Sequence, residues 1–287
     1  MSTALPISSF LTSDGLRLHQ RDWPLPRPRA RLLLVHGLGE HSGRYARLAE
    51  ELNATGVAVR AYDHRGHGRS EGARGCVDEL TRLPRDTVSV FNAYAAEGGD
   101  LPFLFGHSMG GLVAMQAVLL EDLIPRGLIA SSPALATHAG GIQRAFARCL
   151  TGWWPDLTLR TGLAADRLSH DAHVEREYRE DPLNHSRISA RLAHFIFAGG
   201  RRVVARAAEL KIPTLLQFAA DDHLVDPAGA RAFAAAAPQR KLRAHEYLRL
   251  YHEIYNEADP ERSRVVADLL RWLDLQLDKP KRSSQSA

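Results

Sequence analysis

Short apolar runs alternate with helix-like stretches along most of the chain. Apolar runs bounded by Gly, Pro or polar residues are typical of buried strands, and apolar residues three and four positions apart are typical of helices. The strand-like segments are residues 7–11, 16–23, 31–35, 57–62, 101–105, 127–130, 214–218 and 242–250. The helix-like segments are residues 45–53, 87–97, 109–120, 228–236 and 262–277. The alternation predicts an α/β fold whose mostly parallel sheet has helices on both faces, with reactive loops at the carboxyl ends of the strands.

One stretch interrupts this alternation. Between about residues 134 and 206 no strand-like run occurs, and helical fragments are joined by turn-rich segments. Its aromatic residues are Trp153, Trp154, Tyr178, Phe195 and Phe197. Because structureless connections of this length are uncommon, we predict a helical cap inserted into a single domain of residues 1–287. We expect Trp153 and Trp154 to pack within the cap, with transient contact with a membrane surface as the alternative. The polar residues 280–287 are predicted to be a disordered tail.

The composition is typical of a soluble globular protein and argues against membrane-spanning and nucleic-acid-binding classes. The chain has 287 residues, of which 45% are hydrophobic and 24% charged, as in soluble globular proteins. No apolar run approaches the roughly 18 residues that a membrane-spanning helix needs, and the first residues lack the pattern of a signal peptide, so we expect a cytoplasmic protein. The net charge of +4 comes from arginines scattered among acidic residues, without a nucleic-acid-binding motif. Nucleic acid is therefore not an expected partner.

Metal and cofactor binding are not expected either. Two cysteines are too few for a cysteine-based metal site, and the histidines of Asp63-His-Arg-Gly-His67 lack the helical spacing of common zinc ligands. Gly37-Leu-Gly39 would need a third glycine at position 42, which is Ser42, so the dinucleotide-binding pattern fails.

The pattern Gly-x-Ser-x-Gly occurs twice. Gly106-His-Ser108-Met-Gly110 follows an apolar run and opens an apolar helix, which is the strand, tight turn and helix that a nucleophile elbow requires. The second match, around Ser70, lies in a polar loop with no apolar helix after it. We therefore predict that Ser108 is a nucleophile and Ser70 a loop residue.

A serine nucleophile needs a base and an acid that orients the base, and in this topology they follow the serine in the order acid, then histidine. Asp222 follows a predicted strand and is the preferred acid, with Asp221 and Asp226 as alternatives. His252 precedes the last helix, whereas His245 lies within a predicted strand, so His252 is the predicted base.

The oxyanion hole needs backbone N–H groups that are in place before the reaction begins. The expected donors are the N–H of Met109, directly after the nucleophile, and that of Leu38, in the loop after residues 31–35.

At this point the sequence resembles the monoacylglycerol lipase/lysophospholipase family of α/β-hydrolases, among the serine aminopeptidase S33-like hydrolases. The matching motifs are His36-Gly-Leu-Gly-Glu-His-Ser-Gly-Arg-Tyr45, Asp63-His-Arg-Gly-His-Gly-Arg-Ser70, Gly106-His-Ser-Met-Gly-Gly111, Asp181-Pro-Leu, Asp222-His-Leu-Val-Asp226 and Tyr251-His-Glu. The resemblance implies an α/β-hydrolase fold, a cap that forms an acyl channel, and esters of one long acyl chain as substrates. It also implies that Glu40, Arg44 and Tyr178 lie near the polar end of the substrate site, with structural ion pairing or hydrogen bonding as the equal alternative for these residues.

The predicted function is therefore ester hydrolysis through an acyl-enzyme. A cap-bearing serine aminopeptidase or a general carboxylesterase of the same fold is the alternative, and the acids Asp171, Glu175, Glu177 and Glu180 in the cap keep the peptidase open. An epoxide hydrolase or dehalogenase would need an acidic nucleophile where Ser108 stands. A non-catalytic binding protein would normally lack one member of the triad, and none is missing here.

Overall fold

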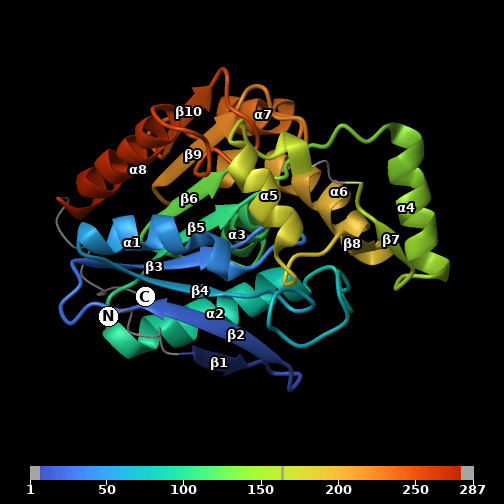
Figure 1. Cartoon of the computed structure of the whole chain (residues 1–287), viewed down its shortest axis with the longest axis horizontal. Helices are drawn as coiled ribbons and strands as arrows, with labels where there is room; N and C mark the ends of the chain where they lie inside the picture. The colour runs from blue at the N-terminus through green and yellow to red at the C-terminus, as the bar shows by residue number, and fades with distance from the viewer. Residues whose placement is uncertain (1–6, 163–164, 279–287) are drawn as a thin grey trace.

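The computed structural model describes residues 7–162 and 165–278, so the disorder predicted for residues 280–287 lies outside the described chain. Its central element is an eight-stranded sheet with the order β1-β2-β4-β3-β5-β6-β9-β10 (Figure 1). The strands are β1 (Ile7–Leu11), β2 (Arg17–Trp23), β3 (Ala30–Val35), β4 (Val57–Tyr62), β5 (Phe103–His107), β6 (Leu128–Ser131), β9 (Thr214–Ala219) and β10 (Leu242–Tyr247). β1 pairs antiparallel with β2 and β2 with β4, and the strands β4, β3, β5, β6, β9 and β10 run parallel to one another.

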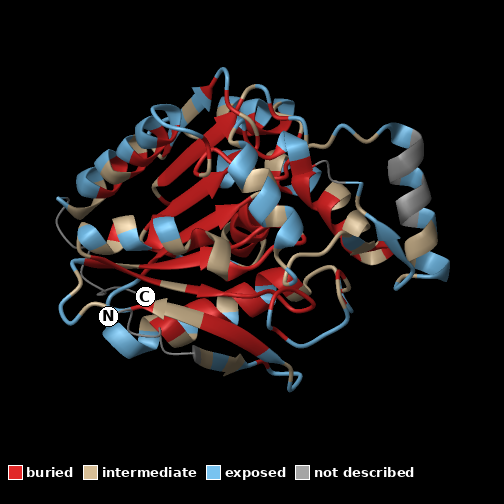
Figure 2. Ribbon diagram, in the orientation of Figure 1, coloured by how far each residue is buried: buried red, intermediate tan, exposed pale blue. Residues whose placement is uncertain are grey.

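Helices cover both faces of this sheet because alternate residues of the central strands point to opposite sides. In β3, Leu32 and Leu34 pack with α1 (Ala46–Ala54) and α8 (Glu261–Leu277). Leu33 and Val35 pack instead with the layer that contains α2 (Arg82–Gly98), α3 (Met109–Leu120) and α7 (Ala228–Ala236). Burial on both faces explains why the central strands are continuous apolar runs rather than alternating ones (Figure 2).

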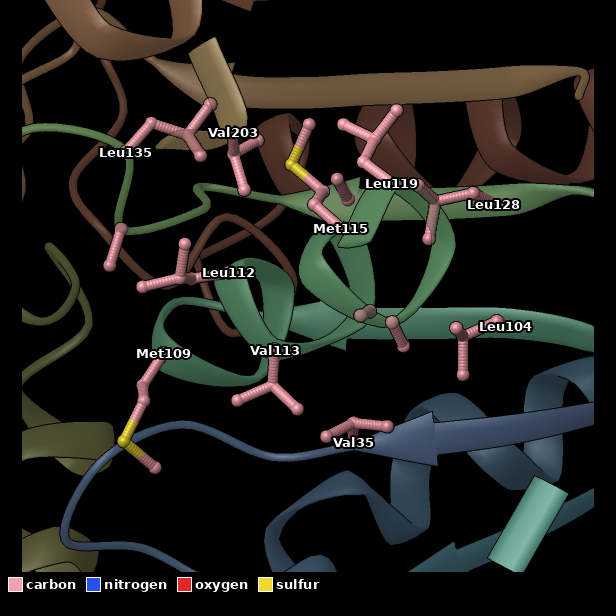
Figure 3. Packing of buried hydrophobic residues seen from close by; sticks show 14 of the residues in the cluster. Val35, Leu104, Met109, Leu112, Val113, Met115, Leu119, Leu128, Leu135 and Val203 are labelled. Carbon is pink, nitrogen blue, oxygen red and sulfur yellow. The ribbon is translucent and has the colours of Figure 1, made fainter. Parts of the chain in front are cut away.

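The central helix of the second layer is α3. Ten of its twelve residues are buried, and apolar side chains leave it on several sides (Figure 3). A helix that is apolar all round is buried all round, so α3 is held rigidly against β5 and β6. Its first residue directly follows Ser108, and the position of that serine is fixed with it.

Two element boundaries differ from the sequence prediction by three residues or more. β10 ends at Tyr247 rather than at residue 250, because residues 248 and 249 form a turn. α2 begins at Arg82 rather than at residue 87, because Pro84 lies in its first turn, where proline is tolerated.

The cap segment, defined here as residues 134–206, lies between β6 and the short helix η3 (Ala207–Glu209). It contains the helices α4 (Gly141–Trp153), α5 (Ala172–Glu180) and α6 (Ala190–Ala205), the short helix η2 (Ala165–Arg167), and the strands β7 (Thr158–Arg160) and β8 (Arg187–Ser189). A further short helix, η1 (Ser42–Tyr45), precedes α1. The prediction that the cap has no strands is wrong, since β7 and β8 pair antiparallel. Three-residue strands are too short to leave an alternating pattern.

The cap also exposes two aromatic side chains that were expected to pack inside it. Trp153 and Trp154 are 79% and 64% exposed, so the predicted packing is wrong. Both lie at the carboxyl-terminal end of α4, where the chain turns toward β7 at the surface. No described helix is both long and apolar enough to cross a membrane.

Candidate active site

Ser108 lies in the tight turn between β5 and α3. Its backbone has φ 55° and ψ −120°, a conformation that is strained for a residue other than glycine. The strain is held by the buried strand before it and the buried helix after it. The turn therefore presents the hydroxyl at the carboxyl edge of the sheet, as the sequence pattern predicted for a nucleophile elbow.

The glycines on both sides of Ser108 are required by close packing. A Cβ atom on Gly106 would collide with the backbone of Gly110, and one on Gly110 would collide with the carbonyl groups of Val35 and His36. Larger residues at these positions would push α3 away from β3 and β5. The Gly-x-Ser-x-Gly pattern thus reflects backbone contact rather than turn flexibility alone.

Asp222 and His252 form a buried pair after β9 and β10. The His252 Nδ1 atom lies 2.6 Å from Asp222 Oδ2, and both side chains are almost fully buried. The other carboxylate oxygen of Asp222 accepts the backbone N–H groups of Leu224 and Val225 at 2.9 Å. The carboxylate is fixed from two sides and holds the imidazole with its Nε2 atom available for proton transfer.

The charges of this pair shift both pKa values in the direction that a catalytic dyad needs. Burial raises the pKa of Asp222, but the charge and hydrogen bond of His252 outweigh it and hold that pKa below its ordinary value. Burial lowers the pKa of His252, but Asp222 outweighs burial and raises the pKa above the ordinary value of 6.5. Each group therefore stabilises the charged form of the other.

The loop after β3 runs directly beside Ser108. A Cβ atom on Gly37 would lie 3.2 Å from the Cβ atom of Ser108. Leu38 follows in this loop, and Met109 is the first residue of α3, whose first backbone N–H groups have no acceptor within the helix. The two predicted oxyanion donors thus lie in the two segments that flank Ser108.

Glu40 holds this loop in place. Its Oε1 atom accepts the backbone N–H of Gly37 at 2.5 Å and the hydroxyl of Tyr45 at 2.6 Å. Its Oε2 atom accepts a hydrogen bond from Arg44 at 2.8 Å. Burial raises the pKa of Glu40, but the Arg44 guanidinium and neighbouring groups outweigh burial and lower the pKa to about 2. Glu40 is therefore an anion that ties the oxyanion loop to η1.

Arg44 extends the network to Glu253, the residue after His252. Its guanidinium donates two hydrogen bonds to the carboxylate of Glu253, at 2.6 and 2.8 Å. Tyr178 of the cap stacks on the same guanidinium at 5.0 Å and donates a hydrogen bond to the carbonyl oxygen of Gly39 at 3.4 Å. The three residues that the resemblance placed near the polar end of the site, Glu40, Arg44 and Tyr178, meet around residues 37–40.

Two neighbours of His252, the predicted base, were not identified from the sequence. Glu253 directly follows His252, but its pairing with Arg44 joins residues far apart in the chain. His107 packs its ring 4.8 Å from that of His252 and makes a hydrogen bond to Ser131 Oγ at 3.0 Å. Burial, followed by the charge of His252, lowers the pKa of His107 to about 4, so it stays neutral beside the base. Its position next to Ser108 in the elbow was the signal available in the sequence.

The alternative residues have other contacts. Ser70 Oγ donates to the carbonyl oxygen of Asp63 and accepts the backbone N–H of His19. Asp221 pairs with His223 at 3.2 Å, and Asp226 accepts the backbone N–H of Ala228 at the start of α7. These contacts fit structural roles in loops and at a helix end.

His245, His64 and His67 also have contacts outside the Asp222–His252 pair. His245 lies in β10, 3.5 Å from Asp268. His64 and His67 are buried against the ring of His36, and burial holds the pKa values of both well below the ordinary range. No group of three or more metal-ligating side chains that could hold an ion occurs within residues 7–162 and 165–278.

Comparisons with known proteins identify the family of the chain. The family described as "Serine aminopeptidase, S33" matches residues 26–259. A monoacylglycerol lipase of Mycolicibacterium smegmatis is 32% identical over 92% of this chain and 95% of its own length. A monoglyceride lipase of Rattus norvegicus is 29% identical over 92% of this chain and 89% of its own length. The chain also matches an uncharacterized abhydrolase domain-containing protein of Dictyostelium discoideum at 32% identity, spanning 30% of that longer protein.

Solved structures give the same result for the fold. The crystal structure of Paleococcus ferrophilus monoacylglycerol lipase has a TM-score of 0.82 at 33% identity and covers 90% of this chain and 99% of that one. A monoglyceride lipase of Saccharomyces cerevisiae, in complex with a substrate analog, has a TM-score of 0.85 at 23% identity, covering 96% and 97% of the two chains. The α/β-hydrolase fold predicted from the sequence is thereby confirmed.

Proposed function

Because the chain belongs to the serine aminopeptidase S33 family of α/β-hydrolases, we propose that it cleaves esters of a single long acyl chain, such as monoacylglycerols or lysophospholipids. The chain is a carboxylic ester hydrolase, and relatives of similar length are named monoacylglycerol lipases. The observation that carries the proposal is the nucleophile elbow at Ser108 together with the buried Asp222–His252 pair, next to the cap segment.

The geometry supports a two-step acyl transfer. His252 Nε2 takes the proton of Ser108 as the hydroxyl oxygen attacks the ester carbonyl, and Asp222 stabilises the imidazolium that forms. The N–H groups of Leu38 and Met109 stabilise the oxyanion. His252 then gives its proton to the leaving alcohol, and in the second step it activates the water that releases the fatty acid.

The polar end of the substrate is proposed to lie beside Glu40, Arg44 and Tyr178. Tyr178 comes from the cap and contacts both Arg44 and the loop at Gly39, so the cap closes over this end of the site. A head group placed there would lie between the cap and the oxyanion loop. The acyl chain would then extend along the apolar side of the cap, where each buried methylene contributes about 0.8 kcal/mol.

The peptidase alternative has less support in the cap. Recognition of a free amine needs carboxylates that are not already paired. Three of the four cap acids named above have local partners: Glu175 pairs with Arg179 at 2.8 Å, Asp171 accepts the backbone N–H of His173, and Glu177 lies 3.5 Å from His173. These local contacts favour roles within α5 over binding of a substrate amine.

The deciding experiment is a kcat/KM panel on monoacylglycerols, lysophospholipids, short-chain esters and aminoacyl amides. We expect long-chain monoacyl esters to have the highest kcat/KM. Ser108→Ala should remove nearly all turnover, whereas Ser70→Ala, corrected for the folded fraction measured by circular dichroism, should retain it. A preference for aminoacyl amides would reject the ester proposal, and loss of turnover only in Ser70→Ala would reject the elbow assignment.

We further propose transient contact of the cap with a membrane surface. Besides Trp153 and Trp154, the exposed cap residues Leu157 and Leu159 present apolar area on the same short stretch of chain. Indole rings are favoured at the interface between lipid and water. Trp153→Ser combined with Trp154→Ser should lower hydrolysis of substrate presented in vesicles more than hydrolysis of a water-soluble short ester. Equal effects on both would reject this contact.

A further inference from the structure

A cavity lies at the edge of the sheet opposite to Ser108. It has a volume of about 710 Å³ and is formed where β5, β6, β9 and β10 begin and where α8 ends. In Figure 1 this edge, beside the end of α8, lies on the far side of the molecule from α4. β5 separates the cavity from the nucleophile, and its five residues span roughly 17 Å at about 3.3 Å each. The cavity is therefore distinct from the catalytic site.

Positive charge dominates its lining. The cations that line it are Arg126, Lys211, Arg240, Lys241, Arg243 and Arg271. Its two acids are Asp100 and Asp268, and Asp268 already accepts hydrogen bonds from Arg271 and Tyr247. Within residues 7–162 and 165–278, Arg240 and Arg243 form no ion pair. Unneutralised cations converging on one cavity give it the potential that attracts an anion.

Apolar side chains lie among these cations. Leu101, Ile124 and Leu275 are 52%, 66% and 57% exposed, and all three line the cavity. Large aliphatic side chains gain by covering their surface, whereas a purely ionic site for phosphate would have no use for them. The lining thus combines anion attraction with an aliphatic surface, inside the volume range of small-molecule sites.

We propose that this cavity is a second binding site for a single-chain anionic amphiphile, a long-chain carboxylate above all. Its head group binds between Arg240 and Arg243, and its chain lies over Leu101, Ile124 and Leu275. Hydrolysis of a long-chain ester releases a free fatty acid, which is such a carboxylate. That the ligand is the enzyme's own product therefore rests on the proposed function. A lysophospholipid with an acidic phosphate head shares the same chemistry.

The position of the cavity favours a dissolved amphiphile over a bilayer. A membrane bound at this edge would hold the opposite, catalytic edge and the cap away from the lipid that contains the substrate. A concave site also encloses one chain better than it fits a flat surface.

The test uses full-length protein whose Ser108 has been labelled with a long-chain alkyl fluorophosphonate, so that the acyl site is occupied. Calorimetry then measures binding of oleate, of oleoyl lysophosphatidate, of neutral monoolein and of inorganic phosphate. The cavity variant is Arg240→Glu with Arg243→Glu. The matched control is Arg27→Glu with Arg201→Glu, which changes the charge equally at exposed arginines outside the cavity.

We expect one oleate per labelled chain, a Kd at least tenfold higher in the cavity variant, an unchanged Kd in the control, and no binding of monoolein or phosphate alone. Tighter binding of lysophosphatidate than oleate would make the phosphate lipid the ligand. Equal oleate binding by the two variants would overturn the site, as would binding only of phosphatidylglycerol vesicles. Failure of the proposed function is seen separately, as absent turnover of monoacyl esters, and leaves the variant comparison intact.

Discussion

Replacing Arg44 by methionine tests whether the buried network beside the base is held by this single cation. Methionine keeps much of the side-chain volume but removes the charge and the three hydrogen bonds of 2.6–2.8 Å to Glu40 and Glu253. Both carboxylates are 4% exposed, so water cannot replace the lost cation. Removing one partner of a buried ion pair costs about 3–5 kcal/mol. At about 2–3 °C per kcal/mol for a chain of this size, Tm should fall by roughly 6–15 °C.

The pH dependence of this loss distinguishes charge from packing. The native pKa of Glu40 is about 2, and that of Glu253 is also lowered. In the wild type, the two carboxylates therefore contribute fully to the free energy of unfolding above the unfolded pKa near 4.5, and this contribution is lost as pH falls through the native pKa values. Without Arg44, whose charge is the largest influence that lowers both pKa values, we expect burial to raise the pKa values of Glu40 and Glu253 above the unfolded value. The variant then gains stability as the carboxylates take up protons, and the difference from wild type should shrink from pH 8 to pH 5.

The assay is thermal and urea unfolding of wild type and variants at pH 8 and pH 5. Arg179→Met is the control, because it removes an exposed ion pair with Glu175 that is worth at most about 1 kcal/mol. Adding Glu253→Gln to Arg44→Met removes one uncompensated charge and should recover part of the loss. The reasoning is refuted if Arg44→Met costs no more than Arg179→Met, or if its cost grows on acidification.

Three further results are expected. The base must be neutral, and the pKa of His252 is raised above 6.5, so kcat/KM should rise with pH through an apparent pKa above that value. A flat profile from pH 5 to 8 would contradict the role of His252. Asp222→Asn should lower kcat by about 10³–10⁴-fold, by analogy with the Ser-His-Asp template, while Asp221→Asn and Asp226→Asn stay within a few fold; the opposite ranking would move the acid. Gly110→Ala should lower both folded yield and kcat, because its methyl group collides with Val35 and His36, and normal values for both would show that the elbow can relax.

The sequence predicts the fold well because its strongest signals are long and local. The strands β3, β4, β5, β6 and β9 leave largely apolar runs, since burial on both faces requires nearly every residue to be apolar. β1, β2 and β10, toward the two edges of the sheet, contain more polar residues. The strands β7 and β8 leave no such pattern, because each has only three residues and lies in the cap. The exposure of Trp153 and Trp154 was likewise not predictable, since composition does not say which face of a helix is covered.

Site residues could likewise be predicted where the signal is local in sequence, and not where it depends on contacts between distant residues. Ser108 could be predicted because a strand, glycines and an apolar helix surround it in sequence. The choice of Asp222 over Asp221 could not be settled from the chain, because adjacent residues share the same local pattern. In the structure, Asp222 accepts two backbone N–H groups on one oxygen, which turns the other oxygen toward His252.

The contacts of Glu253, which the sequence does not predict, bear on the proposed chemistry. Arg44 joins it to Glu40, and Glu40 in turn holds the N–H of Gly37, the residue before the predicted oxyanion donor Leu38. The segment that carries the predicted base, His252, and the loop that carries the predicted oxyanion donor, Leu38, are therefore both tied to one guanidinium. Proton transfer and charge stabilisation must act on the same substrate carbonyl, so their groups need a fixed separation. The buried Arg44 guanidinium between the two segments provides this fixed separation. Apolar residues here would have a lower desolvation cost, but they would not join the two segments by hydrogen bonds.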